Sequence, residues 1–286
     1  MSIDLALIGA SDEAYEEELL RNPYVLKPWI RYLDHKHDRP IHERAFIFER
    51  AVKDLPGSYK LWRMYLHERM EHVEDLNPAT YEKEWEKINY CFERSLVLLH
   101  KMPRIWLEYL QFLLKQCKIS HSRRVFDRAL RALPLTQHSR IWKLYLPFAE
   151  SAAGETGYRV YKRYIRNHPE QSEHYIELLL DNEYYFEAAN TYIHILNDPN
   201  FRSLEGKSNY ELWMELCDIC VHHPSEMTGI NVEQIIRSGI AKFSDQRGKL
   251  WTSLATYWVT RGELEKVVLF QNSSHLLRLE IPLKKE

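Results

Sequence analysis

The sequence predicts an all-α protein, an α-solenoid built from repeated helical hairpins. Its 286 residues include only 9 glycines, and no regular alternation of polar and apolar residues indicates a β-strand. A Trp-x-x-Tyr pattern recurs every 33 to 44 residues, a period typical of stacked hairpins. The first three copies are each followed by an aromatic residue, an acid, an arginine and a small residue. Because one hairpin cannot bury its own apolar stripes, neighbouring hairpins must stack on each other.

An acidic leader, residues 1–22, precedes the first repeat. Its acidic residues lie mainly in 12–18 and surround Tyr15, with Leu19 one turn later. We expect residues 13–21 to form a short helix that caps the first hairpin, because a terminal repeat needs a polar outer face.

Residues 23–266 are expected to form the repeat array, with about seven hairpins. In the first helix of each, two large residues three positions apart share one helix face. The pairs are Trp29/Tyr32, Trp62/Tyr65, Trp106/Tyr109, Trp142/Tyr145, Tyr175/Leu178, Trp213/Leu216 and Trp251/Leu254. The longest spacing, 44 residues, comes from extra residues around 71–83, which we place in the turn of the second hairpin.

The second helix of a hairpin is clearest in residues 103–134. Phe126, Ala129 and Leu133 fall on one helix face, and Pro134 ends the helix because it lacks an N–H group. A polar turn at 118–121 is predicted to join the two helices. The residues expected to form the repeat core are Trp29, Tyr32, Phe48, Trp62, Tyr65, Phe92, Trp106, Tyr109, Phe126, Ala129, Trp142, Tyr145, Trp213 and Trp251.

After residue 266 the repeat pattern is lost. The second-helix consensus is missing from residues 267–286, which contain Leu276, Leu277 and Leu279 instead of a polar cap. We interpret this segment as an atypical tail at the abrupt end of a longer array.

Reactive or metal-binding patterns are sparse. Cys217 and Cys220, followed by His222 and His223, have the only spacing that resembles a zinc site, but a second ligand pair is missing. We interpret the two cysteines as buried structural thiols. No phosphate-binding loop, zinc-protease motif or nucleophile elbow is present, so we predict no catalytic residues and no cofactor. No apolar run approaches the length of about 20 residues that a membrane span needs.

The Trp-x-x-Tyr helix followed by Phe-Glu-Arg-Ala and a proline resembles the HAT repeat, the half-a-TPR module of RNA-processing proteins. Longer strings extend the resemblance to the Syf-type pre-mRNA-splicing factors, called XPA-binding protein in animals. Those strings are His100–Trp106, Phe126–Trp142, Gly206–Trp213 and Phe243–Trp251. The resemblance covers roughly residues 13–266.

The resemblance implies a nuclear, non-enzymatic scaffold in the NineTeen-associated part of the spliceosome. It implies contacts with the aquarius helicase, the Isy-type factor and the crooked-neck-like HAT protein, and a link to transcription-coupled DNA repair through XPA. In this module the adjacent acid and arginine, such as Glu49/Arg50 and Asp127/Arg128, are expected to form salt bridges within or between hairpins. The alternative function is direct RNA binding through residues 115–166, although no recurring polar code for bases is visible.

Charge is segregated along the chain, although the formal net charge is only −2. Residues 115–166 hold twelve basic and three acidic residues, whereas 170–233 hold two basic and thirteen acidic residues. We expect a basic surface for an acidic protein segment or RNA, and an acidic surface for a basic partner. The alternative is that neighbouring repeats neutralise each other. The candidate partner-binding residues are Arg123, Arg124, Arg131, Arg159, Lys162, Arg163 and Arg166.

Overall fold

The computed structural model describes residues 9–152 and 154–273, and within these ranges it contains helices and no strands. This confirms the all-α prediction. In the described part of the chain, short 3-10 turns η2 (Ala10–Asp12), η3 (Pro169–Gln171) and η4 (Ser244–Gln246) accompany fifteen α-helices. The α-helices are α1 Glu13–Arg21, α2 Leu26–His35, α3 Ile41–Asp54, α4 Tyr59–Val73, α5 Glu82–Leu99, α6 Pro103–Leu114, α7 Ile119–Ala132, α8 Leu135–Ala152, α9 Gly154–Tyr164, α10 Ser172–Asp181, α11 Tyr185–Asn197, α12 Asn209–His222, α13 Val232–Lys242, α14 Arg247–Thr260 and α15 Leu264–Ser273.

The helices belong to two compact units, residues 1–148 and 149–286. The border falls inside α8, one residue after Pro147. A proline inside a helix cannot donate the backbone hydrogen bond of its turn, so the helix ladder is weakened where the units meet in sequence.

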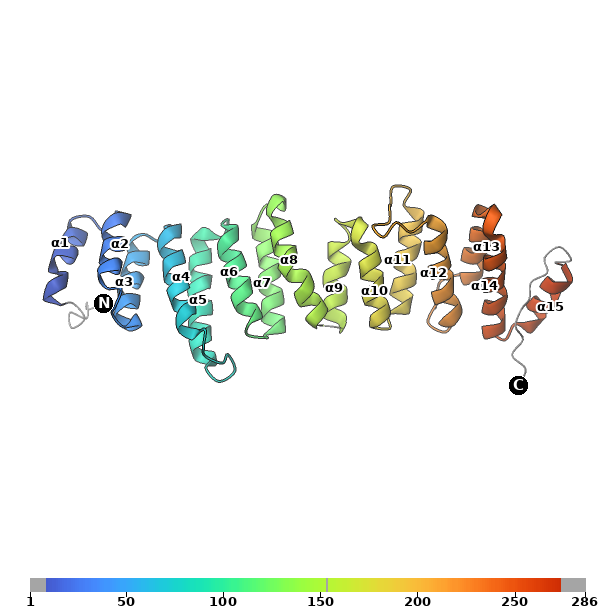
Figure 1. The fold of residues 1–286 in the computed structure, drawn as a ribbon, viewed down its shortest axis with the longest axis horizontal. Helices are drawn as coiled ribbons and strands as arrows, with labels where there is room; N and C mark the ends of the chain where they lie inside the picture. The colour runs from blue at the N-terminus through green and yellow to red at the C-terminus, as the bar shows by residue number, and fades with distance from the viewer. Residues whose placement is uncertain (1–8, 153, 274–286) are drawn as a thin grey trace. The chain divides into compact units, whose positions relative to one another are not determined.

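In the first unit three hairpins follow one another, α2/α3, α4/α5 and α6/α7, and α1 packs on α2 (Figure 1). Each helix also packs against the next one along the chain, so the hairpins stack side by side as a solenoid requires. Aromatic rings pair between hairpins: Phe48 stacks on Tyr65 with ring centroids 5.1 Å apart, and Phe126 stacks on Tyr145 at 4.4 Å. The core of this unit therefore contains a stacked pair of rings at each of these junctions between hairpins.

Helix ends in this unit follow local sequence signals, with one correction. Ser58 accepts a hydrogen bond from the Leu61 amide at the start of α4. The prediction of a turn at 118–121 is wrong, because α7 already begins at Ile119. The chain reverses earlier, at Cys117, whose φ of 54° lies in the left-handed region.

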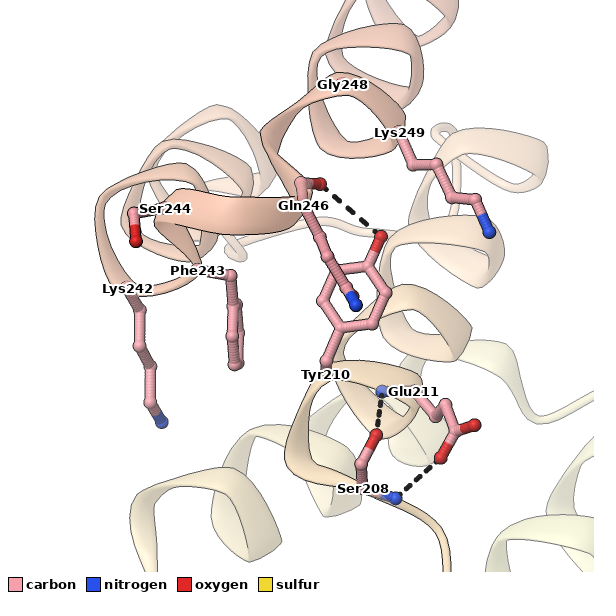
Figure 2. Close-up of a pocket in the computed structure, with 9 residues that line it drawn as sticks. All are labelled: Ser208, Tyr210, Glu211, Lys242, Phe243, Ser244, Gln246, Gly248 and Lys249. Atoms are coloured by element: carbon pink, nitrogen blue, oxygen red, sulfur yellow. Dashed lines mark hydrogen bonds between the residues drawn. The ribbon is translucent and has the colours of Figure 1, made fainter.

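The second unit contains the hairpins α10/α11, α12/α13 and α14/α15, preceded by α9. Helix α12 begins with a capping box: the Ser208 side chain accepts from the Glu211 amide at 3.2 Å, and the Ser208 amide donates to the Glu211 carboxylate at 2.6 Å (Figure 2). Helix α15 reaches Ser273, so it includes the first residues of the segment that the sequence suggested as an atypical tail. The rest of that tail, 274–286, lies outside the described residues.

Twelve of the fourteen residues expected in the repeat core are buried, with at most 6% of the side chain exposed. Trp213 and Trp251 are only half-buried. In both helices the preceding leucine, Leu212 or Leu250, occupies the buried position. The residue before the tryptophan is buried in earlier repeats as well, as Leu61 and Ile105 are, so the register of the apolar stripe is kept and only these two tryptophans are more exposed.

Candidate partner-binding surfaces

Neighbouring hairpins of the first unit are joined by a repeated set of contacts, which we call the carboxylate clamp. The acid of one second helix accepts hydrogen bonds from the tyrosine and the arginine of the next hairpin. For Glu49 the donors are the Tyr65 hydroxyl at 2.7 Å and both terminal nitrogens of Arg94 at 2.8 Å. This bidentate geometry fixes the orientation of the two hairpins as well as their distance.

The same clamp recurs one hairpin later. Glu93 accepts from the Tyr109 hydroxyl at 3.0 Å and from both terminal nitrogens of Arg128 at 2.8 Å. The guanidinium of Arg128 also lies over the Trp106 ring, 5.7 Å from its centroid. One arginine thus contacts the core ring of its own hairpin and the acid of the preceding hairpin.

Helix α1 joins the stack through similar contacts. Arg50 forms a bidentate ion pair with Glu16 of α1, with both N···O distances 2.7 Å, and lies 5.6 Å from the Trp29 ring centroid. Tyr15 of α1 stacks on Tyr32 at 5.5 Å. The short acidic helix therefore occupies the position of a second helix preceding the first hairpin.

The clamps hold their carboxylates in the charged form. Burial alone would raise the pKa of Glu49, but the hydrogen bonds from Arg94 and Tyr65 outweigh burial, and the pKa is lowered. The same balance lowers the pKa of Glu93, where burial is outweighed by the Arg128 hydrogen bonds. Both carboxylates are therefore ionised at neutral pH and stabilise the stack.

The tryptophans of the first three repeats add a second repeated bond at the start of the first helices. In these repeats the indole N–H donates to the backbone carbonyl six residues earlier, in the turn that enters the helix. The bonds are Trp29 to Pro23 at 2.8 Å, Trp62 to Pro56 at 2.8 Å and Trp106 to His100 at 2.7 Å. Tryptophan is thus required for its N–H as well as its size, because the buried donor fixes the incoming chain.

Three of the candidate partner-binding residues lie on α7 in the first unit. Arg124 and Arg131 are exposed and Arg123 is half-buried. Within residues 9–152 and 154–273, neither Arg123 nor Arg124 forms an ion pair, and Arg131 donates to the Asp127 carbonyl at 3.2 Å. Helical spacing places Arg124 and Arg131 about one turn before and after Arg128 on the same face of α7, and we call these three residues the α7 arginine row. Arg128 is paired with Glu93, whereas Arg124 and Arg131 form no ion pair among the described residues.

The other four candidates, Arg159, Lys162, Arg163 and Arg166, are exposed and lie in the second unit. Arg159 pairs with Glu155. Lys162 bonds the Tyr158 hydroxyl at 2.6 Å and lies 3.4 Å from a carboxylate oxygen of Glu187. The seven candidates are therefore divided between two units, and each group must be considered as a surface of its own.

Other basic residues of 115–166 are neutralised by the preceding hairpin, as the alternative interpretation of the charge pattern expects. Lys115 pairs with Glu74 at 3.1 Å. Lys118 lies between Glu82 at 2.6 Å and Glu86 at 3.2 Å. The basic surface is accordingly smaller than the sequence count suggests, and its cations in residues 115–148 that lack an ion pair among the described residues lie on α7 and, as Arg140 and Lys143, on α8.

An exposed apolar pair on α5 was not predicted from the sequence. Tyr90 and Val97 are 66% and 72% exposed, and Arg94 between them lies 5.8 Å from the Tyr90 ring centroid. Because Arg128 of α7 pairs with Glu93 of α5, the α7 arginine row lies beside this pair. Two apolar residues seven positions apart, opposite the buried stripe, were the signal that could have revealed it.

In the second unit an open hollow of about 820 Å³ lies between the start of α12 and the α13–α14 connection (Figure 2). Tyr210 and Phe243 line it with Lys242 and Lys249. The Lys242 ammonium is 5.2 Å from the Trp213 ring centroid. Ammonium groups beside rings can bind a carboxylate or an aromatic group of a partner.

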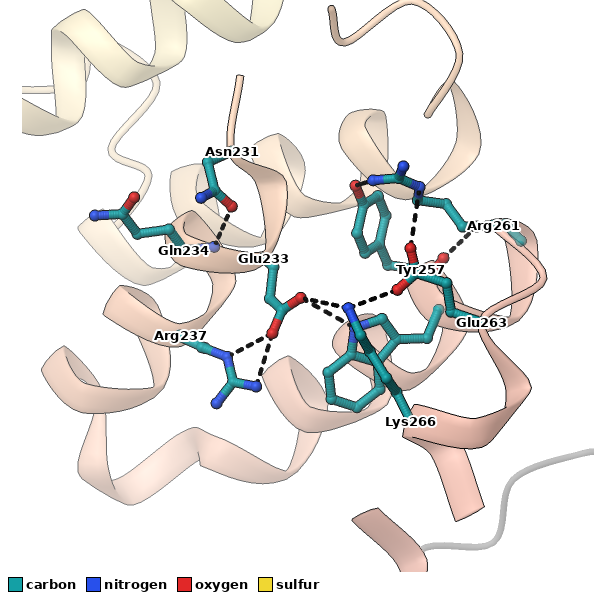
Figure 3. A network of polar contacts seen from close by, with 10 residues as sticks. Asn231, Glu233, Gln234, Arg237, Tyr257, Arg261, Glu263 and Lys266 are labelled. Atoms are coloured by element: carbon teal, nitrogen blue, oxygen red, sulfur yellow. Dashed lines mark hydrogen bonds and ion pairs between the residues drawn. The ribbon is translucent and has the colours of Figure 1, made fainter. Parts of the chain in front are cut away.

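Helices α13, α14 and α15 meet at one carboxylate (Figure 3). Glu233 accepts from Arg237 at 2.8 and 3.0 Å, and from the Trp258 indole at 3.4 Å. Lys266 of α15 lies 3.4 Å from Glu233 and 2.7 Å from Glu263. As in the carboxylate clamp, an acid of one second helix is bound by an aromatic donor and a cation of the next hairpin.

The thiols of the zinc-like pattern are buried in α12, as expected for structural cysteines. Cys217 and Cys220 are at most 1% exposed, and burial raises the pKa of each thiol to about 12. His222 is exposed and bonds the Asp218 carbonyl at 2.7 Å. Among the residues that the structure describes, no group of three or more His, Cys, Asp or Glu side chains could hold a metal ion. In the same part of the chain, no helix is long and apolar enough to cross a bilayer.

Two family models match almost all of the described chain. The N-terminal HAT repeat of the pre-mRNA-splicing factors Syf1/CNRKL1 matches residues 11–170, and the middle HAT repeat of the pre-mRNA-splicing factor SYF1 matches residues 172–272. The first match alone covers more than half of the chain. The chain belongs to the Syf1 family of HAT-repeat splicing factors.

Curated relatives include pre-mRNA-splicing factor syf1 of Emericella nidulans, 48% identical over 92% of this chain and 34% of that protein. Cwf3 of Schizosaccharomyces pombe is 47% identical over 93% of this chain and 34% of that protein. Human SYF1 is 47% identical over 89% of this chain and 30% of that protein. The chain thus spans about a third of the length of these relatives.

The Syf1 family match has two structural correlates. Its two models meet at η3 (Pro169–Gln171), between α9 and α10. The second model extends to residue 272 and so covers most of α15, whereas the resemblance seen in the sequence ended near residue 266.

Proposed function

We propose that this chain acts in pre-mRNA splicing as a non-enzymatic scaffold that binds spliceosomal proteins. The relatives that it matches at 47–48% identity are named as pre-mRNA-splicing factors. Family membership supports a role in splicing, and the chain's own geometry supports the way in which it would act. A nuclear location follows from this role.

The observation that carries the proposal is the carboxylate clamp. The polar groups that recur in the repeats, such as Glu49, Tyr65 and Arg94, bind one another between hairpins. They hold the hairpins in fixed positions, so a partner meets a preformed surface. A preformed surface loses little conformational entropy on binding, which makes it suited to holding several partners in a fixed arrangement.

The resemblance to the Syf-type factors suggests who the partners are. We propose the aquarius helicase, the Isy-type factor and the crooked-neck-like HAT protein. A contact with XPA, and through it a role in transcription-coupled DNA repair, is a further part of this proposal. Catalysis has no place in this proposed function.

The α7 arginine row is the proposed docking surface of the first unit. Arg124 and Arg131 are exposed beside Tyr90 and Val97, so the surface combines positive charge with apolar area. An acidic protein segment with apolar side chains would satisfy both features. In the second unit Arg159, Lys162, Arg163 and Arg166, the other basic residues that the sequence pattern indicated, form a separate candidate surface.

Direct RNA binding is the alternative, and one observation favours it. Arg123 and Arg124 have no ion-pair partner in the described part of the chain, and the exposed ring of Tyr90 could stack on a base. Such binding would be strongly salt-dependent and insensitive to sequence.

The test is affinity purification of the tagged chain from nuclear extract, with and without nuclease. Recovery of spliceosomal proteins in the presence of nuclease is the expected result, and Arg123→Glu/Arg124→Glu should remove a subset of them. Lys27→Glu/Arg39→Glu is the matched control, because it changes the charge equally at two exposed residues of the first hairpin. Loss of all partners on nuclease treatment would replace the scaffold by the RNA-binding alternative.

A further inference from the structure

A groove of about 320 Å³ lies between α10, α12 and the segment 203–207 of the second unit. Its floor is apolar: Ile176 is buried, and Leu180 and Ile219 are half-buried. Leu204, in the segment that borders the groove, is 63% exposed. The groove therefore offers apolar contacts both at its base and beside its edge.

On one side of the groove, two acids bind groups of the segment 203–207 and hold it in place. Glu173 is 6% exposed and accepts from the Ser203 hydroxyl at 2.6 Å and from the Leu204 amide at 2.9 Å. Lys207 bonds Glu215 at 2.8 Å. These contacts hold the segment 203–207 against both helices, so the groove is a built feature and not the gap beside a loose loop.

Lys207 also shows what kind of group this groove accepts. Its ammonium lies between Glu215 and Glu205, at 2.8 and 3.1 Å, and its pKa is raised, chiefly by the hydrogen bond to Glu215. Two acids that line the groove therefore already bind a side chain with an aliphatic stem and a cationic end, that of Lys207.

Two further lining acids have no such cation. In the described residues neither Glu177 nor Asp218 pairs with a lysine or arginine, and the neighbour of Glu177 is His174, with an N···O distance of 3.4 Å. The surrounding sequence adds to the negative field, because residues 170–233 contain thirteen acids and two bases. A polyanion such as RNA would be repelled here, whereas a basic protein segment would be attracted.

We propose that this groove is the docking site for a basic, amphipathic segment of a protein partner. The aliphatic stem of an arginine lies on Ile176, Leu180 and Ile219, and its guanidinium binds Glu177 and Asp218. Arginine fits better than lysine, because its planar fork can bind carboxylates through paired hydrogen bonds. An apolar residue of the same segment packs on Leu204. The inference rests on the proposed scaffold function, to which it adds the chemistry of one partner surface.

The test uses the full chain and a fluorescein-labelled peptide with arginine and leucine on one helical face. A scrambled peptide of the same composition is the first control, and fluorescence anisotropy reports the binding. Glu177→Gln/Asp218→Asn should weaken binding at least about fivefold, because two charge-assisted contacts are lost. Leu180→Trp, which fills the groove and leaves every charge in place, should weaken it similarly.

The matched control is Glu183→Gln/Glu226→Gln, which removes the same charge from exposed acids outside the groove. It should change affinity less than about twofold. Equal losses in both double variants, or equal binding of the scrambled peptide, would show general attraction to an acidic surface and overturn the inference. Circular dichroism of each variant checks that the fold is kept.

The two proposals fail separately. If the nuclear extract yields no spliceosomal proteins while the peptide still depends on Glu177 and Asp218, the scaffold function is wrong and the groove is a binding site of another process. If spliceosomal proteins are recovered equally by the chain and by Leu180→Trp, and the peptide does not distinguish the variants, the groove inference alone is wrong.

Discussion

Replacing Glu93 by glutamine should weaken the stack of hairpins measurably, because it removes the charge at the centre of one clamp. Glutamine keeps the shape of the side chain and leaves no cavity, but its amide has only one acceptor oxygen, so one of the two Arg128 bonds is lost and the remaining contacts lose their ionic character. Hydrogen bonds to charged groups contribute about 1.5–3 kcal/mol when buried, and exposed ion pairs about 0.2–1 kcal/mol. The Glu93 and Arg128 side chains are 32% and 43% exposed, which places the pair between these limits. We expect a loss of about 1–2 kcal/mol in the free energy of unfolding.

A double-mutant cycle isolates the clamp from other effects. Arg128→Met keeps an unbranched stem over Trp106 and removes the guanidinium. Combined with Glu93→Gln, it should give a coupling free energy of about 1 kcal/mol in urea unfolding followed by circular dichroism. The matched cycle is Glu17/Arg21, an exposed pair within α1 at 67% and 75% exposure, which should couple by no more than about 0.5 kcal/mol.

The pH dependence supplies an independent check. The pKa of Glu93 is lowered in the folded state, so its contribution is fully present above the unfolded pKa of about 4.3 and is lost as the pH falls through the folded value. The stability difference between the natural chain and Glu93→Gln should therefore shrink below about pH 4. A coupling equal to that of Glu17/Arg21, or a difference that is unchanged at low pH, would refute the clamp as a stabilising contact.

Other expectations follow from the core. In the native chain a thiol reagent should label Cys117 quickly and Cys217 and Cys220 only after denaturation, because the first is exposed and burial raises the pKa of the other two to about 12. Gly239→Ala should lower the free energy of unfolding by about 1–3 kcal/mol in urea titration, since its Cβ would lie 2.4 Å from the Trp213 indole nitrogen; an unchanged midpoint would contradict this packing. Above pH 10 the chain should lose stability in a spectroscopic titration, because burial raises the pKa of several core tyrosines, and the unfolded state then releases protons that the folded state keeps.

The repeat pattern predicted the fold because each repeat gives the same local signals. A tryptophan and a tyrosine three residues apart define the buried stripe, and a proline after the second helix defines where it ends. The pattern also suggested that the acid and arginine of Glu49/Arg50 form salt bridges. It could not say with which residues, since neighbours on a helix point about 100° apart. Glu49 binds forward to Arg94, and Arg50 binds backward to Glu16.

The candidate surfaces were harder to predict, because the charge of a residue says nothing of its partners. Lys118 looked like part of a basic surface, but two acids of the preceding hairpin neutralise it. Glu173 looked like one acid among many, but it is buried and bonds the Ser203 hydroxyl thirty residues later. Such contacts depend on how hairpins stack and leave no periodic trace in the sequence.

The carboxylate clamp connects each hairpin only to the next. In the first unit, loss of the Glu93 contacts would leave the contacts of Glu49 with Tyr65 and Arg94 intact. Unfolding would spread from the hairpins that have lost the contact to their neighbours, because the hairpins do not share one common core. On α9 the position that follows the aromatic residue is Lys162, which pairs with Glu187 instead of serving as an acceptor. The repeated contact therefore changes at α9, and heating should unfold the chain in segments with separate melting temperatures.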